Sequence, residues 1–177
     1  MFIRDLDMCT YHNGPFDAKN WSVPLLAVGW LEYPKPYTQG DVPSNLISKL
    51  ESMVQQTRAA YLHIVFRGTM DCTFCKLAGP IWSQENLFVP GNHVVYVAPG
   101  GIVHYVRDHS YSPPQEFIDA ALRCSDCQSG EYQKELTRAN QGREAPLETE
   151  KQFQDSINLR VKQRQDRGRT NTVLTVL

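Results

Sequence analysis

The sequence predicts an α+β domain over about residues 1–127, followed by a charged helical extension over residues 128–177. Short apolar runs of strand character are interspersed with segments of helical periodicity along the first part of the chain. With 41% hydrophobic residues, the chain of 177 residues can bury a sizeable core. After Cys127 the composition changes, because residues 128–169 are rich in Gln, Glu, Lys and Arg and poor in aromatic residues.

The first half of the domain is predicted to contain two strands and one helix. The apolar run Val23–Tyr33 predicts a buried strand that begins after Pro24, and Tyr61–Phe66 alternates as a second strand does. Between them, Ser44–Thr57 predicts an amphipathic helix, and Pro43 suits its first turn. The apolar stripe of this helix consists of Leu46, Ile47, Leu50, Met53 and Val54.

The second half of the domain is predicted to be a knuckle, a β-hairpin and a helix, followed by one more short helix. The turn signal Pro90-Gly91-Asn92 separates the two strands of the hairpin. The last helix has a buried stripe of Phe117, Ile118, Ala121 and Leu122. The predicted elements are the knuckle Cys72–Cys75, the strands Asn86–Val89 and His93–Val97, a helix after Pro99-Gly100-Gly101 and a helix after Pro113-Pro114.

Two cysteines and two histidines of this unit form a zinc-type motif. Cys72-Thr-Phe-Cys75 has the spacing of a knuckle that presents two thiolates on one side, and His104 and His109 follow on the predicted helix. Two thiolates and two imidazoles are a common tetrahedral ligand set for Zn²⁺. Because four protein ligands leave no open coordination position, and no His-Glu-x-x-His pattern is present, the predicted zinc is structural.

The spacing of the two histidines restricts the helix that carries them. His104 and His109 are five positions apart, which is about 140° around an ideal helix. The helix must therefore end or tighten before His109, and Asp108-His109-Ser110 is the predicted terminus. The 28 residues between Cys75 and His104 far exceed the ~12 of a DNA-reading finger, so the motif does not predict that class of protein.

Other assignments of the metal ligands remain open at the level of sequence. A second pair, Cys124-Ser-Asp-Cys127, could join the first in a four-cysteine site, or the pairs could form separate or mixed sites. In the alternative in which no metal binds, Cys72 and Cys75 are thiols in a loop and His104 is a histidine on one face of a helix. Asp71 and Asp108 flank the ligands and could each accept a hydrogen bond from a histidine ring, although solvated carboxylates are the simpler interpretation.

Catalytic interpretations are weaker than the metal site. Cys9 and His12 could form a nucleophile and its base, but no third orienting group is identifiable and a buried thiol beside core residues explains them more simply. His63 is interpreted as a half-exposed strand residue, and His93 as an alternative zinc ligand at a strand start. Redox chemistry is disfavoured at either Cys-x-x-Cys pair, Cys72/Cys75 or Cys124/Cys127. At Cys72 the flanking sequence indicates a knuckle and not the start of a helix.

Composition excludes several classes of function. The formal net charge of −1 gives no global attraction to nucleic acid, although a basic segment near the C-terminus could contact it locally. That segment contains Arg160, Lys162, Arg164, Arg167 and Arg169. No apolar run approaches the ~18 residues of a membrane helix, and residues 1–7 lack a signal sequence. The sequence therefore predicts a cytoplasmic protein with no membrane association, in which the five cysteines stay reduced.

Several motifs together resemble a family of small bacterial proteins of unknown function, over roughly residues 5–124. The resemblance implies a standalone cytoplasmic domain of unassigned activity and carries over no catalytic residue. It supports one site formed by Cys72, Cys75 and His104, with His109 as the fourth candidate. The motifs are Asp5-Leu-Asp-Met-Cys9-Thr-Tyr-His12, Ala27-Val-Gly-Trp30-Leu-Glu, Phe66-Arg-Gly, Tyr96-Val-Ala-Pro-Gly100-Gly-Ile-Val-His104-Tyr and Pro113-Pro-x-Glu-Phe117.

The function predicted from these observations is that of a zinc-stabilised module that binds another protein. Among small bacterial proteins, this type of role includes immunity and antitoxin proteins. The apolar tail Val173–Leu177 could add a strand to the sheet edge of a partner. Two other classes remain: an enzyme, either a zinc hydrolase or a thiol enzyme, and a nucleic-acid-binding protein that uses the C-terminal basic segment.

Overall fold

The fold is that of a computed structural model, which describes residues 1–10, 21–60, 69–75, 81–83 and 86–140. The chain divides into two compact units, Met1–Ala145 and Pro146–Leu177, and every element given below lies in the first. The predicted strand Tyr61–Phe66, His12, His63, the basic segment and the C-terminal tail lie outside the described residues. The elements are β1 (Leu25–Ala27), α1 (Leu46–Ala60), β2 (Thr69–Asp71), β3 (Ile81–Ser83), β4 (Asn86–Pro90), β5 (Val95–Pro99), α2 (Ile102–Asp108), α3 (Gln115–Arg123) and α4 (Gly130–Ala139).

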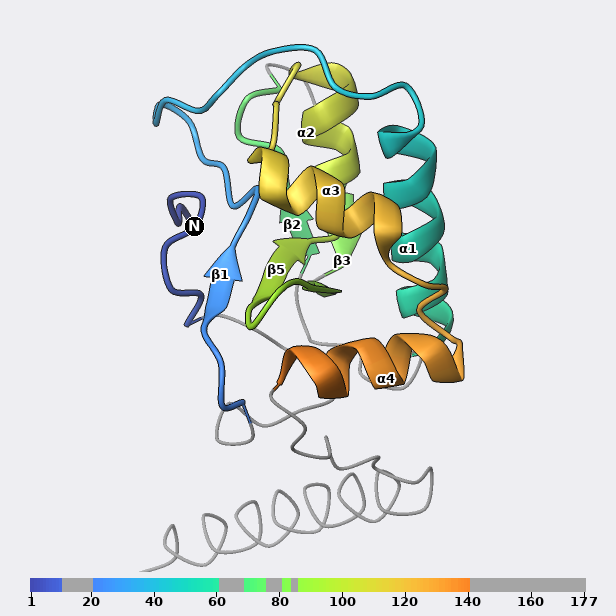
Figure 1. The fold of residues 1–177 in the computed structure, drawn as a ribbon. Coiled ribbons are helices and arrows are strands. Elements are labelled where there is room, and N and C mark those ends of the chain that lie inside the picture. The colour runs from blue at the N-terminus through green and yellow to red at the C-terminus, as the bar shows by residue number, and fades with distance from the viewer. Residues whose placement is uncertain (11–20, 61–68, 76–80, 84–85, 141–177) are drawn as a thin grey trace, which may run out of the picture. The chain divides into compact units, whose positions relative to one another are not determined.

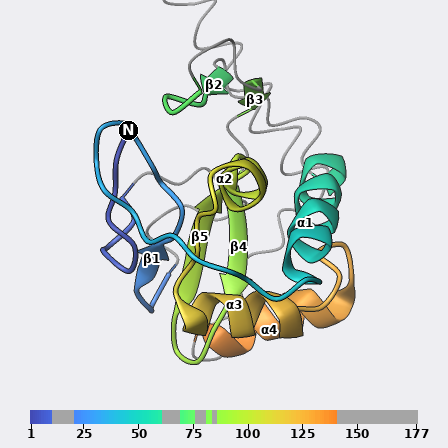
Figure 2. The same cartoon turned by 90° about the horizontal axis from the view of Figure 1, so that it is seen from above.

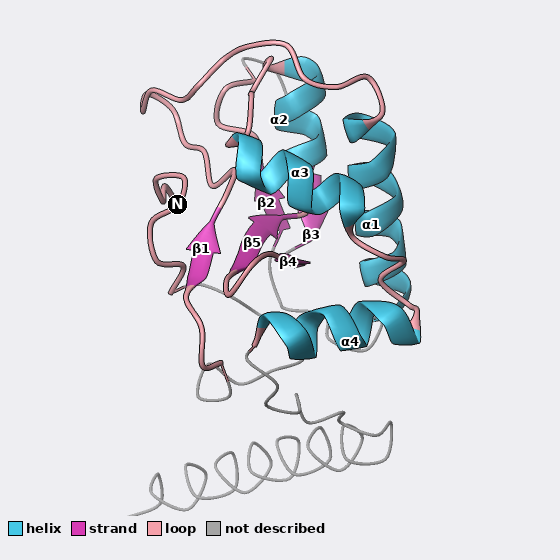
Figure 3. Ribbon diagram, in the orientation of Figure 1, coloured by secondary structure: helices cyan, strands magenta, loops and turns pink. Residues whose placement is uncertain are grey.

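The fold is α+β, as the sequence predicts (Figures 1 and 3). A three-stranded sheet has the order β1-β5-β4, and a second, two-stranded sheet pairs β2 with β3. β4 and β5 form the predicted antiparallel hairpin, whereas β1 runs parallel to β5. The parallel pairing joins residues 25–27 to residues 95–97, so a long crossover containing α1 and the second sheet connects them.

The hairpin strands are buried on both faces. All five residues of β5 are buried, and so are four of the five in β4. This explains why both strands read as continuous apolar runs and not as alternating patterns. The second strand begins at Val95, two residues later than predicted, because Asn92 and His93 belong to the turn. His93 has a positive φ of 54°, and the Gly91 amide donates to the carbonyl of Val94.

The first strand is much shorter than its apolar run predicts. Only Leu25–Ala27 pairs as a strand, because Gly29 adopts a φ of +75° and turns the chain out of the sheet. A Cβ atom at Gly29 would lie 3.0 Å from the Cγ1 atom of Ile102, so the packing of Ile102 also favours glycine here. The prediction of a strand through residue 33 is wrong for this reason. Trp30 still contributes to the core, and its indole N–H donates to the carbonyl of Val97.

The helices cover the sheet largely as their apolar stripes predict. Leu46, Leu50 and Met53 of α1 are fully buried, and this helix contacts α2, α3 and β4. Figure 2 shows α1 beside β4, on the side of the sheet away from β1. In α3, Phe117 packs edge-on against Tyr96 of β5, with ring centroids 5.9 Å apart. The helix α2 is buried along residues 102–106, which places its metal-type side chains on a rigid central element.

The segment after Cys127 begins with a well-packed helix. The Ser129 hydroxyl caps α4 by accepting from the amide of Tyr132, and the Tyr132 hydroxyl donates to the carbonyl of Phe88 in β4. The sequence-based division into a domain over residues 1–127 and an extension over 128–177 stays a prediction, to which the structure adds this contact. Among the helices in the described part of the chain, none has the length and apolar character needed to cross a membrane.

Candidate metal centre

The knuckle and the end of α2 bring four potential ligands together. Cys72 and Cys75 flank a tight turn directly after β2, while His104 lies in α2 and His109 follows it. The ligand atoms of these four residues all lie within 4.8 Å of one another. The structure therefore assembles the four residues that the sequence motif selects, from segments about thirty positions apart.

The distances in this cluster match the edges of a coordination tetrahedron. The Nε2 atoms of the two histidines are 3.1 Å apart. The Sγ atom of Cys75 is 3.4 Å from the Nε2 atom of His104 and 3.5 Å from that of His109, while the Sγ atom of Cys72 is 3.2 Å from the latter. Zn–S bonds of ~2.3 Å and Zn–N bonds of ~2.0–2.1 Å give edges of about 3.3 Å for N···N and about 3.6 Å for S···N.

The end of α2 gives His109 its position. The helix ends at Asp108, and His109 leaves the helical conformation with a φ of −121°. Its amide still donates to the carbonyl of Tyr105, and the next residue, Ser110, has a positive φ of 52°. The prediction that the helix must end before His109 is thereby confirmed. The change in backbone direction allows two histidines five positions apart to face one point.

Asp108 orients the imidazole of His104. The Nδ1 atom of His104 donates to Oδ2 of Asp108 over 2.6 Å, one helical turn along α2. A neutral imidazole that carries its proton on Nδ1 presents the lone pair of Nε2, which is the atom directed at the cluster. Metal-binding histidines typically have such a carboxylate partner. Asp71, the other carboxylate that the sequence offers, is exposed.

Two of the four ligands are buried, and the other two, Cys75 and His109, are partly exposed. Cys72 is 4% exposed and His104 is 7% exposed. Phe74, which lies between the two cysteines, packs near Tyr105 and His109, with centroid distances of 6.2 and 5.6 Å. Burial raises the pKa of the Cys75 thiol, and the neighbouring Cys72 raises it further. Burial also lowers the pKa of His109, as does the imidazole of His104.

The segment before α1 covers the knuckle, which the sequence did not indicate. The amide of Tyr33 donates to the hydroxyl of Thr73 over 2.8 Å. The rings of Tyr33 and Tyr37 pack edge-on against Phe74, with centroids 6.1 and 5.1 Å apart. The segment Tyr33-Pro-Lys-Pro-Tyr37 is aromatic and proline-rich, which can indicate a packing or binding segment. No spacing rule, however, connects this segment to a turn forty residues later.

The alternative ligands lie elsewhere. Cys124 and Cys127 follow α3 and pack against α1, and among the described residues neither joins Cys72 and Cys75 in a group of metal-type side chains. The four-cysteine site is thus not assembled. His93 lies in the hairpin turn and does not join the cluster. Cys9 is buried, and its amide donates to the carbonyl of Leu25.

Fold and site together define a small α+β protein with a Cys/His cluster of metal-binding type. The chain belongs to a family known as the domain of unknown function DUF7919, whose model matches residues 1–122. All four residues of the cluster lie within that range. Comparison with curated proteins and with solved structures gives no significant match.

Proposed function

We propose that the protein is a zinc-stabilised binding module, in which Cys72, Cys75, His104 and His109 hold one structural Zn²⁺. One observation carries the proposal: four donor atoms from two segments converge within 4.8 Å at the separations of a tetrahedron. Two thiolates with two imidazoles favour Zn²⁺ over the hard cations Mg²⁺ and Ca²⁺, which select oxygen ligands.

The environment of the cluster supports a structural role for the ion and not a catalytic one. Four protein donors complete a tetrahedral sphere and leave no position for a water molecule. The carboxylate nearest to the ligands, that of Asp108, is engaged by the ring of His104 and so orients a ligand. Zinc at this place joins the knuckle after β2 to the C-terminal end of α2.

The experiment that tests the metal centre is quantification of metal in the purified full chain, followed by replacement with Co²⁺. We expect one equivalent of zinc per chain. The cobalt form should show the sulfur-to-metal charge-transfer band and the intense visible bands of a tetrahedral site with thiolate ligands. A chain that folds without bound metal, or a cobalt spectrum of octahedral type, would contradict the proposal.

The binding part of the proposal rests on the aromatic face beside the metal centre. We define this face as Tyr33, Tyr37 and Phe74, whose rings contact one another in series. Tyr33 is 66% exposed although its backbone is fixed by the hydrogen bond to Thr73. An exposed tyrosine on a fixed backbone is typical of the residues that anchor protein interfaces, because little conformational entropy is lost when it is buried.

A photo-reactive aromatic amino acid placed at position 33 tests this face in cells that contain the native chain. We expect adducts with one defined protein at position 33, and none with that protein from the exposed position of Gln128. When His104→Ala is added to the chain that carries the photo-reactive residue at position 33, the adduct should be lost. The same labelled chain without this substitution, loaded with one equivalent of zinc, should keep it. Equal labelling from both positions would argue against the aromatic face, yet would leave the metal centre intact.

A further inference from the structure

The second cysteine pair lies in a short connection that is fixed at both ends. The amide of Cys127 donates to Oε1 of Gln56 in α1 over 2.8 Å. Ser125 donates to the carboxylate of Glu135 in α4 through both its amide and its hydroxyl, at 3.0 and 2.7 Å. The amide of Cys124 caps α3 by donating to the carbonyl of Ala120. The connection therefore holds the two thiols in fixed positions.

The two thiols of this pair lie close to each other. The thiols of Cys124 and Cys127 are close enough for each to shift the pKa of the other, and the residues are only 5% and 7% exposed. Two neighbouring thiols in a Cys-x-x-Cys segment need little movement to form a disulfide. Neither is part of a group of metal-type ligands among the described residues. The pair is therefore a preorganised dithiol and not a second metal knuckle.

Groups from α1 favour a thiolate in this pair. The neighbouring thiol of Cys124 lowers the pKa of Cys127, and the Thr57 hydroxyl and the Lys49 ammonium lower it further, against the opposing effect of burial. The neighbouring thiol of Cys127, together with burial, raises the pKa of Cys124. The Lys49 ammonium also donates to the carbonyl of Cys124. These groups favour a thiolate on Cys127 over one on Cys124.

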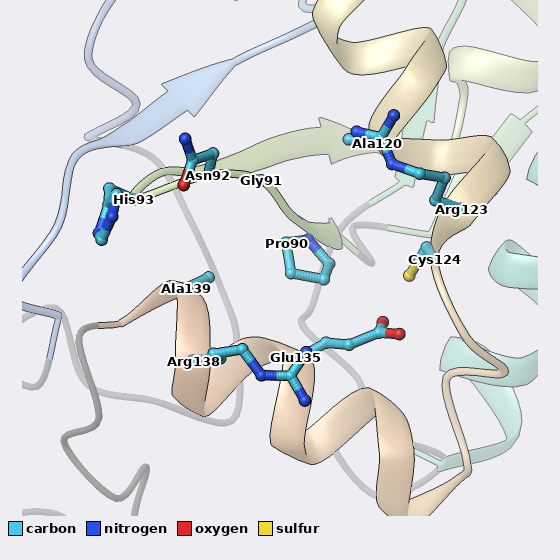
Figure 4. Close-up of a pocket in the computed structure, with 10 residues that line it drawn as sticks. All are labelled: Pro90, Gly91, Asn92, His93, Ala120, Arg123, Cys124, Glu135, Arg138 and Ala139. Atoms are coloured by element: carbon cyan, nitrogen blue, oxygen red, sulfur yellow. The ribbon is translucent and has the colours of Figure 1, made fainter.

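Cys124 lines a pocket of about 470 Å³ between the hairpin turn, α3 and α4 (Figure 4). This volume lies within the range of small-molecule sites. Two arginines line the pocket from opposite walls, Arg123 at the end of α3 and Arg138 on α4. Glu135 also lines the pocket, but both its oxygens accept hydrogen bonds from Ser125. Arg138 also pairs with Glu131 on the same helix at 3.4 Å. The pocket therefore places two arginines and one carboxylate next to the thiol of Cys124.

We propose that Cys124 and Cys127 form a redox-active dithiol that reduces a small, negatively charged disulfide bound in this pocket. The anionic groups of the disulfide would pair with Arg123 and Arg138, while its sulfurs approach Cys124. This activity is independent of the proposed zinc centre, because it uses different residues at the other end of the β4–β5 hairpin.

The exchange balances as two successive displacements. The thiolate of Cys127 accepts the proton of Cys124 as the Cys124 sulfur attacks one sulfur of the disulfide RS–SR. The S–S bond breaks, and the leaving thiolate takes up the proton from Cys127 as RSH. The restored Cys127 thiolate then attacks the Cys124 sulfur of the mixed disulfide and expels RS⁻. The protein dithiol loses two electrons, and the substrate disulfide gains them.

The test uses the zinc-loaded full chain with oxidised glutathione as an anionic disulfide and hydroxyethyl disulfide as a neutral one. We expect a disulfide between Cys124 and Cys127, located by peptide mapping after alkylation, with two thiol equivalents released per chain. The Cys127→Ser variant should stop at a glutathione adduct on Cys124, and this adduct should form more slowly than the wild type reacts, because the thiolate that accepts the Cys124 proton is absent. In the Cys124→Ser variant no such adduct should form.

The arginines provide a test that does not alter the buried pair. The double variant Arg123→Ala, Arg138→Ala should react about fivefold more slowly with oxidised glutathione and at an unchanged rate with hydroxyethyl disulfide. Arg4→Ala, which removes an exposed arginine outside the pocket, is the matched control and should match the wild type. Oxidation of Cys72 and Cys75 in place of Cys124 and Cys127, or an equal rate for the double variant and wild type with glutathione, would overturn the proposal.

Discussion

The two Cys-x-x-Cys segments of this chain have the same spacing but different surroundings. Cys72 and Cys75 sit in a turn after β2 and face two imidazole nitrogens, with no lysine or arginine among the groups that shift the pKa of Cys75. Cys124 and Cys127 face each other and lie near the ammonium of Lys49. Neutral imidazoles complete a metal site, whereas a single cation favours a free thiolate.

The spacing of two cysteines therefore does not determine their chemistry. Two thiols in a turn supply half of a tetrahedral site, and the other half must come from elsewhere in the fold. In the first segment α2 and the residue after it supply that half, with His104 and His109. In the second, α1 supplies Thr57 and Lys49, which are a hydroxyl and an ammonium and cannot complete a metal site of this type.

The largest expected effect is the loss of zinc from the cluster that contains Cys72 and Cys75. His104→Ala should abolish zinc binding and destabilise the fold by on the order of 10 kcal/mol, since the binding energy of a structural zinc is folding energy. Metal analysis and thermal unfolding measure both quantities. His93→Ala is the control, because His93 lies in the hairpin turn outside the cluster. A folded His104→Ala variant with full zinc content would refute the ligand assignment.

The next effect concerns the carboxylate that supports His104. Asp108→Asn should weaken zinc binding about 10- to 100-fold, because the imidazole loses a charged hydrogen-bond acceptor that fixes its tautomer. Competition with a chromophoric chelator measures the dissociation constant. Asp71→Asn provides the matched control. Because the Asp71 side chain is exposed, this variant should bind zinc with an affinity close to that of the wild type. Equal losses in both variants would mean that the hydrogen bond is not the cause.

A third prediction distinguishes the two segments directly. The double variant Cys124→Ser, Cys127→Ser should keep one equivalent of zinc and lose about 1–2 kcal/mol of stability, from imperfect replacement of a buried thiol pair. Chemical denaturation with parallel metal analysis tests both outcomes. Release of zinc from this variant would instead support the alternative ligand set of four cysteines.

The smallest effect is a shift in the reactivity of the dithiol with pH. The lowered pKa of Cys127 predicts that its alkylation by a small reagent has a midpoint below that of an ordinary thiol. Lys49→Met should raise this midpoint, because a positive charge stabilises the thiolate and its removal favours the protonated form. Lys134→Met, which alters an exposed lysine of α4 near Glu131, should leave the midpoint unchanged. Identical midpoints for wild type and Lys49→Met would remove the electrostatic distinction between the two segments.

Local patterns in the sequence were sufficient to predict several elements and the composition of the cluster. The stripe of Leu46, Leu50 and Met53 correctly indicated α1, and the signal at Pro90-Gly91-Asn92 correctly indicated the hairpin. The angular argument about His104 and His109 correctly placed the end of α2. These predictions succeeded because helical periodicity, turn chemistry and helix geometry are properties of neighbouring residues.

Features that depend on tertiary contacts were not predictable. The positive φ of Gly29, which shortens β1, accompanies the close packing of Ile102 against it. Asp71 and Asp108 both flank ligands in the sequence, and only the fold shows that Asp108 meets the ring of His104. Likewise, nothing in the sequence around Cys127 indicates that Lys49 lies near it, because α1 is about seventy positions away.

The β4–β5 hairpin separates the cysteine pair of the metal-type cluster from the pair Cys124 and Cys127. Its strand β5 leads into α2 at one end (Figure 1), where the metal-type cluster lies. Its turn at Pro90–His93 borders the pocket at the other end (Figure 4). Five paired residues span about 17 Å, far beyond the reach of a disulfide. A thiol of one pair therefore cannot attack the other pair while the strands stay paired. The hairpin thus protects the folded chain against scrambled cross-links, and detection of a Cys72–Cys124 or Cys75–Cys127 bridge would report that the domain had opened.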